Sequence, residues 1–378
     1  MSLLNARNAR NARNARNARN ARSDGENFGT GALIEALMRT RDGIAGAEQI
    51  AGVVGAASGL DMGARLYRLD PDHREAVIAG ELLEDIAFDM TGYAPAQSTA
   101  QTVTVLRRTA AGDALNATYT PLASITRPGL DGFQQAVALV GHYAELRADR
   151  AAEIDVQTEE LVAFFASILP IEPSRSDKIL EMLDMAQDIA TFVVMRVKLA
   201  LGCPRPGQFS DLIQPMIACP THATFPSGHA TQAFTLATVL TLMQDPAAGV
   251  PADSQLYRLA CRIAINRTVA GVHFPADSAA GAVLGIQLGR YLMARGRAAN
   301  GAAGTVGSAS FDGVAYTNGS DPRDFHYAVL NTMTGGGGVS GGDGDSTAFA
   351  ADASDVRPAP MWGSLTAAAI AEWGQRWS

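Results

Sequence analysis

Residues 226–236, Pro-Ser-Gly-His-Ala-Thr-Gln-Ala-Phe-Thr-Leu, join a tight turn to a helical pattern. The turn places the Ser227 hydroxyl and free backbone amides at a helix N-terminus, where the helix dipole favours bound anions. Gly228 leaves room for a ligand against the main chain because it has no Cβ, and His229 stands in the same first turn. The stretch therefore predicts an anion-binding site at the start of a helix.

A block of cations precedes this stretch. Lys198 closes an apolar, helix-like run over residues 190–197, and Arg205 follows within Cys-Pro-Arg-Pro-Gly at residues 203–207. The prolines cannot continue the helix, because they lack amide donors and one would clash with the preceding turn. Arg205 therefore returns from a stiff loop and offers a planar fork to an oxyanion, while Lys198 supplies a mobile point charge.

A third block follows further along the chain. Residues 257–270 have helical spacing with Arg267 near the C-terminal end, and Pro275 suits the first position of the next helix. Asp277 lies one turn from His273, close enough to accept the Nδ1 proton of its imidazole. That hydrogen bond fixes the tautomer and leaves Nε2 of His273 as a nucleophile or a metal ligand. Together the three blocks predict a cage that holds a tetrahedral oxyanion and acts on it.

The ordered blocks resemble the superfamily that joins type 2 phosphatidic acid phosphatases, bacterial acid phosphatases and vanadium-dependent haloperoxidases. The family pattern is Lys-six-Arg-Pro, then Pro-Ser-Gly-His, then Ser-Arg-five-His-three-Asp. The chain departs from it at Asn266, where the family usually has a Ser that makes a secondary contact. The motifs lie between Lys198 and Asp277, and a looser similarity extends over residues 130–298.

The resemblance implies an all-α fold, a helical bundle with a vanadate or phosphate site at converging helix ends. It also implies a role for each motif residue. Lys198, Arg205 and Arg267 would neutralise the oxyanion, and Ser227 with the Gly228 amide would hydrogen-bond to it.

The two motif histidines would carry the chemistry that the resemblance implies. His273, supported by Asp277, is the apical group: it either attacks phosphorus or forms the single protein bond to the vanadium of vanadate. His229 is the acid–base on the opposite side. Phosphate and vanadate share charge and shape, so one cage can serve either anion.

Our leading hypothesis from the sequence is a soluble enzyme of the haloperoxidase-like branch, which oxidises halide with hydrogen peroxide at vanadate bound to His273. Lys198 would polarise the bound peroxide and His229 would move its protons. His222 lies five residues before Ser227, where haloperoxidases of this superfamily carry His or Phe beside the vanadate. Phosphatases show a similar His-x-x-Phe approach to this motif, and a loop histidine that caps the helix is a further interpretation.

Two other functions are open from the sequence. A soluble acid phosphatase or phosphotransferase would act on small phosphomonoesters through a phosphohistidine at His273, with His229 protonating the leaving oxygen. A non-catalytic oxyanion-binding module is the third. The presence of both histidines and Asp277 disfavours it, because binding alone needs only the cations and the helix amides.

Composition narrows the class of protein. The 378 residues are 47% hydrophobic, which is ample for a core, and the formal net charge of −8 gives no reason to bind nucleic acid. The apolar stretches are interrupted or too short to cross a bilayer. The three cysteines lack CxxC spacing and are expected to be buried in a reducing compartment. We therefore expect a cytoplasmic protein with no nucleic-acid or membrane partner, and a homo-oligomer stays open.

Four segments are expected along the chain. Residues 1–27 contain tandem Asn-Ala-Arg repeats and read as a disordered leader, with a basic tail for anionic partners as the alternative. Residues 28–300 would be the helical catalytic domain, with a motif core at 190–298. Residues 301–348 are Gly-rich, and we interpret them as a loop or linker, or as an active-site lid. Residues 349–378 are expected to form a C-terminal helical segment.

Local periodicity predicts helices upstream and downstream of the motifs. The apolar spacing favours helices at residues 32–39, 75–90, 132–150, 158–169, 177–201 and 365–377. Residues 102–106 and 117–119 alternate as extended chain does, and we interpret both as loop.

Overall fold

The computed structural model describes residues 35–40, 59–91, 101–112, 115–250, 254–336, 341–352 and 354–377. The expected leader at 1–27 lies outside these ranges. The contacts between residues divide the chain into two compact units, a first unit of residues 1–78 and a second unit of residues 79–378. In the first unit residues 35–40 are helical, and Asp61 caps α3 (Met62–Leu66) by accepting the Ala64 N–H at 2.7 Å.

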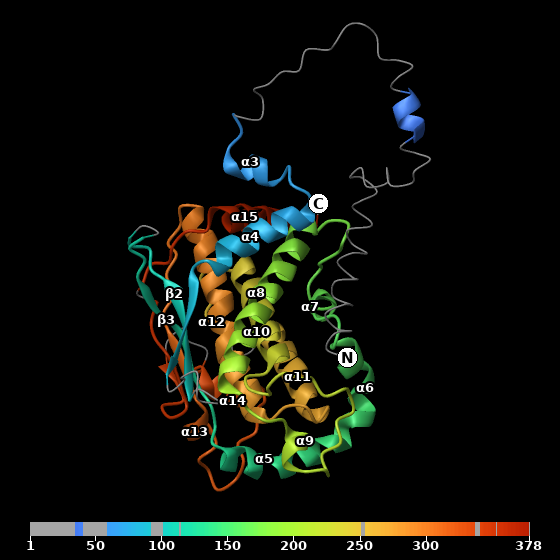
Figure 1. The fold of residues 1–378 in the computed structure, drawn as a ribbon, viewed down its shortest axis with the longest axis vertical. Coiled ribbons are helices and arrows are strands. Elements are labelled where there is room, and N and C mark those ends of the chain that lie inside the picture. Colours follow the sequence, from blue (N-terminus) through green and yellow to red (C-terminus); the bar gives the residue numbers. More distant parts are fainter. Residues whose placement is uncertain are drawn as a thin grey trace, which may run out of the picture. The chain divides into compact units, whose positions relative to one another are not determined.

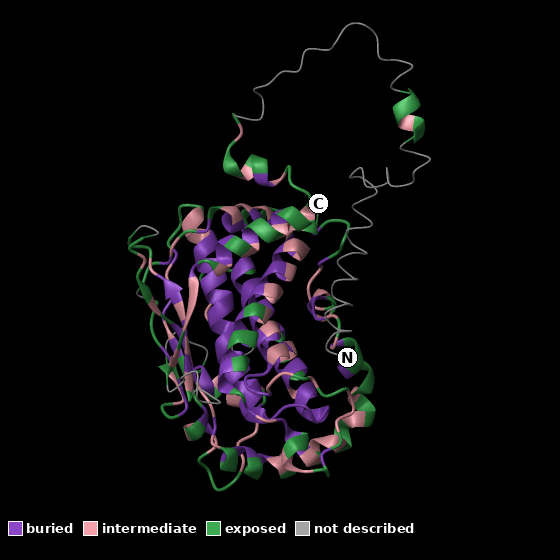
Figure 2. Cartoon of the chain, in the orientation of Figure 1, coloured by how far each residue is buried: buried purple, intermediate pink, exposed green. Residues whose placement is uncertain are grey.

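The second unit is built around long helices that lie side by side in Figure 1. They are α8 (Asp177–Leu201), α10 (Gly228–Gln244), α11 (Gln255–Val269) and α12 (Pro275–Ala299). The prediction of a helix at 177–201 is confirmed, and it ends because Gly202 adopts φ 58° and donates its N–H to the Lys198 carbonyl at 3.0 Å. α12 begins at Pro275 as expected. Figure 2 shows that α10 and α12 are buried almost throughout.

α10 and α12 pack closely because glycines face α10 at four-residue intervals. A Cβ at Gly281 would lie 2.8 Å from the Ser227 carbonyl oxygen, and one at Gly285 would lie 2.4 Å from the Thr231 carbonyl oxygen. This approach lets the Ser227 N–H donate to the Asp277 carbonyl at 2.8 Å. The helix pair therefore joins the second and third sequence blocks at one end.

The expectation of an all-α fold is wrong, because a six-stranded mixed sheet flanks the helices (Figure 1). Its order is β1-β2-β3-β4-β6-β5, with β3 and β4 parallel and the other pairs antiparallel. The strands are β1 (Ile86–Thr91), β2 (Thr102–Arg108), β3 (Tyr119–Thr126), β4 (Ala309–Asp312), β5 (Gly341–Gly342) and β6 (Thr347–Phe349).

The alternation at 102–106 belongs to a strand rather than a loop. Val103 and Val105 of β2 are fully buried, and Phe88 of β1 pairs with Val105. The helix expected at 75–90 therefore ends early, as α4 (Pro71–Leu83). Such strands are stable only when they are paired. β3 pairs with β4, which lies far along the chain, and local alternation cannot reveal a partner so distant in sequence.

The remaining helices differ from expectation mainly in their ends. The expected helices at 132–150 and 158–169 are shorter pieces in the structure. The shorter pieces are α5 (Leu130–His142), η2 (Tyr143–Leu146), α6 (Arg147–Val156) and α7 (Val162–Ala166). Other helices of this unit are α9 (Pro206–Phe209), α13 (Gly313–Tyr316), α14 (Tyr327–Met333) and α15 (Pro360–Gly374).

The Gly-rich segment contains ordered elements. Within 301–348, expected to be a loop or linker, the structure places β4, α13, α14, β5 and the start of β6. Cys203 and Cys261 are buried as expected, but Cys219 is exposed. Within the described ranges no helix combines the length and the hydropathy that a bilayer crossing requires.

Candidate functional site

His273 lies at the centre of the site with its Nδ1 atom fixed. Nδ1 is 2.8 Å from Oδ2 of Asp277, one helical turn later, as the sequence predicts. The same oxygen accepts the Thr224 hydroxyl at 2.5 Å and the Phe274 N–H at 2.9 Å. Because Oδ2 can only accept from a neutral imidazole N–H, Nδ1 of His273 carries the proton and Nε2 keeps its lone pair.

Arg205 lies on the Nε2 side of this imidazole. Its Nη1 is 3.3 Å from Nε2 of His273 and donates to the Val272 carbonyl at 2.7 Å. Its Nη2 is 3.1 Å from Nδ1 of His222, and the His222 carbonyl accepts from both Nε and Nη2 of the guanidinium. His222 therefore lies within the site, in contact with the guanidinium of Arg205.

Lys198 reaches the same place from α8. It is 1% exposed, and Nζ donates to the carbonyls of Ala223 and Thr224 at 2.8 Å each. An ammonium has three N–H donors, so one is left for a bound ligand. Burial first, and then the charge of Arg205, lower the pKa of Lys198 well below its usual range.

The start of α10 presents donors to the same region. Oγ of Ser227 caps the helix by accepting the Ala230 N–H at 3.3 Å, which leaves its own proton available to donate. The first amides of a helix lack intrahelical partners, and these include the Gly228 N–H. A Cβ at Gly228 would lie 3.8 Å from Cε of Lys198, so the helix end and the ammonium are neighbours.

Arg267 and His229 meet at Gln157, the residue that follows α6. Nη2 of Arg267 donates to Oε1 of Gln157 and to the Ile154 carbonyl, at 3.1 Å each. Nε2 of His229 is 3.0 Å from the Gln157 carbonyl oxygen. A carbonyl can only accept, so Nε2 of His229 carries the proton and Nδ1 is the atom that can exchange one.

Burial and the surrounding cations keep the site's imidazoles neutral. Burial, followed by Arg205 and Lys198, lowers the pKa of His273 well below its usual range. Burial, followed by Arg267, does the same to His229, and burial with Lys198 lowers the pKa of His222 to about 4. Burial raises the pKa of Asp277 to about 6, although hydrogen bonds from Thr224 and the Phe274 N–H act in the opposite direction.

The residues fit a tetrahedral oxyanion. Arg267 is 1% exposed, and its Nε and Nη1 atoms have no hydrogen-bond partner within the described part of the chain. Buried guanidinium groups are normally paired, so these two donors are suited to an anion. Lys198, Arg205 and the amides of α10 supply the other donors. Phosphate and vanadate both match this charge and donor set.

The structure brings every site residue predicted from sequence into two adjoining groups. Lys198, Arg205, His222, Ser227, Gly228, His273 and Asp277 form one, and Arg267 and His229 form the other around Gln157. The two groups adjoin, because the charges of both Arg267 and Lys198, one from each group, act on the buried imidazole of His229 and lower its pKa. Sequence reasoning missed Thr224 and Gln157. The Thr three residues before Ser227 carried a weak signal, while Gln157 carried none because its contacts arise only from folding.

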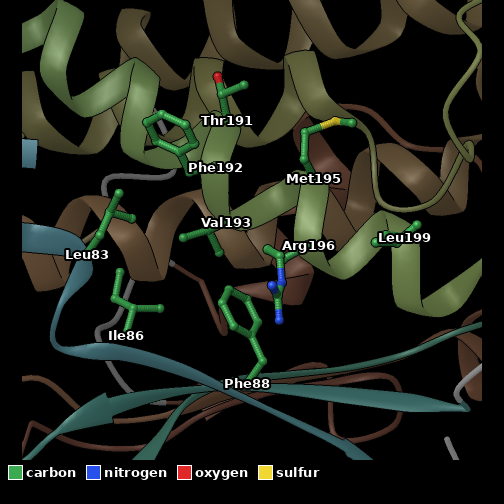
Figure 3. Close-up of a pocket in the computed structure, with 9 residues that line it drawn as sticks. All are labelled: Leu83, Ile86, Phe88, Thr191, Phe192, Val193, Met195, Arg196 and Leu199. Carbon is green, nitrogen blue, oxygen red and sulfur yellow. The ribbon is translucent and has the colours of Figure 1, made fainter. Parts of the chain in front are cut away.

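An apolar groove elsewhere in this unit is separate from the site. It has a volume of about 620 Å³, and Figure 3 shows Ile86 and Phe88 facing Phe192, Met195 and Arg196 of α8 across it. Arg196 lies over the Phe88 ring at 5.2 Å. The described residues that line the groove include no histidine, so they lack the chemistry of the motif site. No His/Cys/Asp/Glu cluster suited to a metal ion occurs in the portion of the chain that the structure describes.

Comparison with known proteins agrees with the geometry. Residues 185–299 match the profile of the PAP2 superfamily. Among curated proteins the chain has no significant match. The matched range holds each residue of the three sequence blocks, and it excludes Gln157 and the sheet. Residues 185–299 are therefore a PAP2 superfamily domain, of the superfamily that includes acid phosphatases and vanadium haloperoxidases.

Proposed function

We propose that the chain is a phosphohydrolase of the acid phosphatase type, which acts on small phosphomonoesters through a phosphohistidine at His273. The observation that carries this proposal is the fixed imidazole: Nδ1 is bound to Asp277 at 2.8 Å, and Nε2, with its lone pair, is 3.3 Å from Nη1 of Arg205. A nucleophile next to a cation is what attack on a phosphate ester needs. The chain itself supplies every group in this reaction.

In the first step the ester's phosphate oxygens lie among Lys198, Arg205 and Arg267. Nε2 of His273 forms a bond to phosphorus while the bond to the leaving oxygen breaks, and that oxygen takes a proton from Nδ1 of His229. In the free protein His229 is neutral because of burial and Arg267. A bound phosphate dianion opposes the charge of Arg267 and so favours the imidazolium, which forms when Nδ1 of His229 takes up a proton from solvent before the first step.

In the second step water replaces the alcohol. Nδ1 of His229, now without its proton, accepts one from the water, whose oxygen attacks phosphorus. The bond from phosphorus to Nε2 breaks, its electron pair returns to His273, and phosphate leaves. Asp277 holds the Nδ1 proton of His273 throughout, which stabilises the charge on the imidazole when it is phosphorylated.

A vanadate-dependent haloperoxidase is the second candidate, and the position of His222 favours it. His222 contacts Arg205 at 3.1 Å, beside the oxyanion cage, where haloperoxidases of this superfamily carry His or Phe. Vanadate bound there would be held by His273 and the same cations, and it would supply a Lewis acid that activates peroxide. His229, neutral with a bare Nδ1, could accept a peroxide proton.

The test is a paired assay on metal-stripped protein. One arm measures hydrolysis of p-nitrophenyl phosphate, and the other adds vanadate, peroxide and bromide and follows bromination of an activated diketone. We expect hydrolysis without added metal and, after acid-free quenching, a phosphohistidine that mass spectrometry maps to residue 273. Halogenation without hydrolysis would instead select the second candidate.

Two variants sharpen the assay. His273→Ala should abolish hydrolysis and the phosphoenzyme while inorganic phosphate still binds the remaining cage. His229→Ala should lower hydrolysis of alkyl phosphates by about 10²–10⁴-fold, because their leaving oxygen needs a proton. It should spare phosphoenzyme formation from p-nitrophenyl phosphate, whose leaving group departs without one. A phosphoenzyme in His273→Ala would contradict the proposal.

A further inference from the structure

Among the residues that the structure describes, Arg267 is held only by neutral oxygens, although it is almost fully buried. Its contacts are Oε1 of Gln157 and the Ile154 carbonyl. Burial alone lowers its pKa, to about 10, without a carboxylate acting in the opposite direction. An uncompensated buried charge is costly. The cost is offset when an anion binds at Nε and Nη1, the two atoms that have no hydrogen-bond partner in the described ranges.

A carboxylate lies close by but is kept from Arg267. Glu153 of α6 binds Arg262 through both oxygens, and its Oε2 also accepts from Nδ2 of Asn266 at 3.1 Å. The same Nδ2 donates to Oε1 of Gln157 at 2.9 Å, while Arg150 donates to Oδ1 of Asn266 at 2.8 Å. Asn266 therefore stands between the carboxylate and the residue that orients Arg267.

Gln157 also touches the second group of the site. Its carbonyl accepts the Nε2 proton of His229 at 3.0 Å, so that the bare Nδ1 is the atom left for chemistry. Gln157 itself is 1% exposed and lies outside the matched range 185–299. One residue at the end of α6 thus contacts both the cation and the acid–base group.

We propose that Gln157 is a positioning residue for the oxyanion site. Its side chain aims Arg267 while leaving the arginine's charge uncompensated, and its main-chain carbonyl fixes the tautomer of His229. Asn266 holds Gln157 in place and keeps Glu153 away. The inference rests on the proposed function for its link to turnover, but its tests use anion binding and spectroscopy, which do not require turnover.

A neutral residue is essential to this arrangement. Glutamate at position 157 would accept the same hydrogen bonds from Arg267 and Asn266, and would pair with the arginine as a charged partner. The fold would keep its contacts, but the anion would lose much of its attraction to Arg267. If the role of Gln157 were purely structural, Gln157→Glu would keep these contacts and leave the anion affinity unchanged. A loss of anion affinity without a loss of stability therefore distinguishes a positioning role from a structural one.

The experiment measures binding of inorganic phosphate and orthovanadate by calorimetry to the full chain. Gln157→Glu should raise both dissociation constants by more than about tenfold, since a buried charge pair competes with the anion, and should leave thermal stability near wild type. Gln157→Met, which removes the acceptor at similar length, should raise them by about three- to tenfold. This is less than the full strength of a hydrogen bond to a charged group, because the free and the anion-bound protein both lose that bond. Isotope-edited NMR should find His229 as the Nε2–H tautomer in the wild type, with the signal assigned from His229→Ala.

Gln287→Met is the matched control. Gln287 is likewise buried and accepts from an arginine, Arg290, at 2.8 Å, but it lies along α12 and binds the Leu122 and Gly307 carbonyls. Its replacement should lower thermal stability and leave the phosphate affinity within about twofold, because the lost bonds are not at the anion site.

Several outcomes would overturn the inference. These are wild-type affinity in folded Gln157→Glu, wild-type affinity in Gln157→Met, a His229 that is an Nδ1–H tautomer, or a wild-type protein that binds neither anion. If Gln157→Glu does not fold, Gln157→Met and the tautomer decide the question. Failure of the proposed function looks different: the wild type would bind phosphate with the expected responses to these variants and hydrolyse no ester.

Discussion

At the scale of single residues, the site depends on one carboxylate among several cations. Asp277 is fully buried, and its Oδ2 accepts from Thr224, His273 and the Phe274 N–H. Oδ1 has no hydrogen-bond partner within the described residues. The carboxylate therefore acts through a single oxygen, and its main effect is to fix the tautomer of His273.

Asp277→Asn should separate turnover from binding. An amide can present its NH₂ group to Nδ1, which favours the wrong tautomer of His273, and turnover should fall by about 10²–10⁴-fold. Phosphate affinity should not fall, because the change removes a negative charge near the cations. Steady-state kinetics and calorimetry measure the two effects. Thr224→Val, which removes one donor to the same oxygen, should reduce turnover much less; equal losses would argue against tautomer control.

At the scale of elements, the site depends on how closely α10 approaches α12. The Cβ that Gly285 lacks would lie 2.4 Å from the Thr231 carbonyl oxygen and 2.9 Å from Cβ of Phe234. These are backbone and core atoms that cannot move aside cheaply. The contact between the helices also holds the start of α10 against Asp277 through the Ser227 N–H.

Gly285→Ala should therefore destabilise the fold, by about 1–3 kcal/mol from overpacking, and weaken phosphate binding by displacing the start of α10. Chemical denaturation and calorimetry measure the two losses. Gly80→Ala in α4 is the control, since a Cβ there meets nothing within 4 Å. That change should raise stability by up to about 1 kcal/mol. A neutral result for Gly285→Ala would mean that the helices can move apart without cost.

The Gly-rich segment has a turn that one carboxylate organises. Asp343 accepts the N–H groups of Asp345, Ser346 and Thr347, and its Oδ2 accepts from Arg323 at 2.9 Å. Burial raises the pKa of Asp343, but the hydrogen bonds from Ser346, Thr347, Asp345 and Arg323 outweigh it and hold the pKa below the usual range. This turn leads into β6 and joins the segment to the sheet.

A carboxyl whose pKa is lowered on folding stabilises the fold above its unfolded pKa of about 3.9, and this contribution is lost as the pH falls through the folded value. Asp343→Asn should thus cost about 1–3 kcal/mol at neutral pH, with the difference from wild type narrowing at acid pH. Denaturation at several pH values measures it. Asp345→Asn, whose side chain takes no part in these bonds, should change little at any pH. A cost for Asp343→Asn that does not vary with pH would contradict this account.

At the scale of the whole second unit, a buried ion cluster connects distant segments. Asp85, which precedes β1, is fully buried and binds Arg295 of α12 and Arg357 near α15. Arg295 also donates to the carbonyls of Glu81 and Leu82. Sheet, central helix and C-terminal helix thus meet at one carboxylate.

Removing that carboxylate should be among the most damaging single changes. Asp85→Ala leaves the buried Arg295 without its charged partner and should cost about 3–5 kcal/mol in the free energy of unfolding. Glu84→Ala is the matched control, because Glu84 pairs with the same Arg357 at the surface and exposed pairs contribute about 0–1 kcal/mol. Urea denaturation of both variants tests the contrast. Equal, small losses would show that the cluster adds nothing to stability.

The sequence alone determined the features that depend on neighbouring residues. The limits of α8, the proline at the start of α12, the helix start after Ser227 and the bond from His273 to Asp277 follow from turn chemistry and helical spacing over a few residues. The ordered blocks also identified the family domain and the residues of the candidate site other than Thr224 and Gln157.

Only the tertiary structure decided the sheet, the helices and strands within the Gly-rich segment, and the contacts of Gln157. β3 pairs with β4 from the far end of the chain, and Gln157 meets Arg267 and His229 from outside the family domain. Alternation in 102–106 could not show a partner, because strand pairing is set by contacts between segments distant in sequence. The physical reason is the same in each case: local chemistry fixes how a segment starts, bends and ends, whereas packing fixes which segments meet.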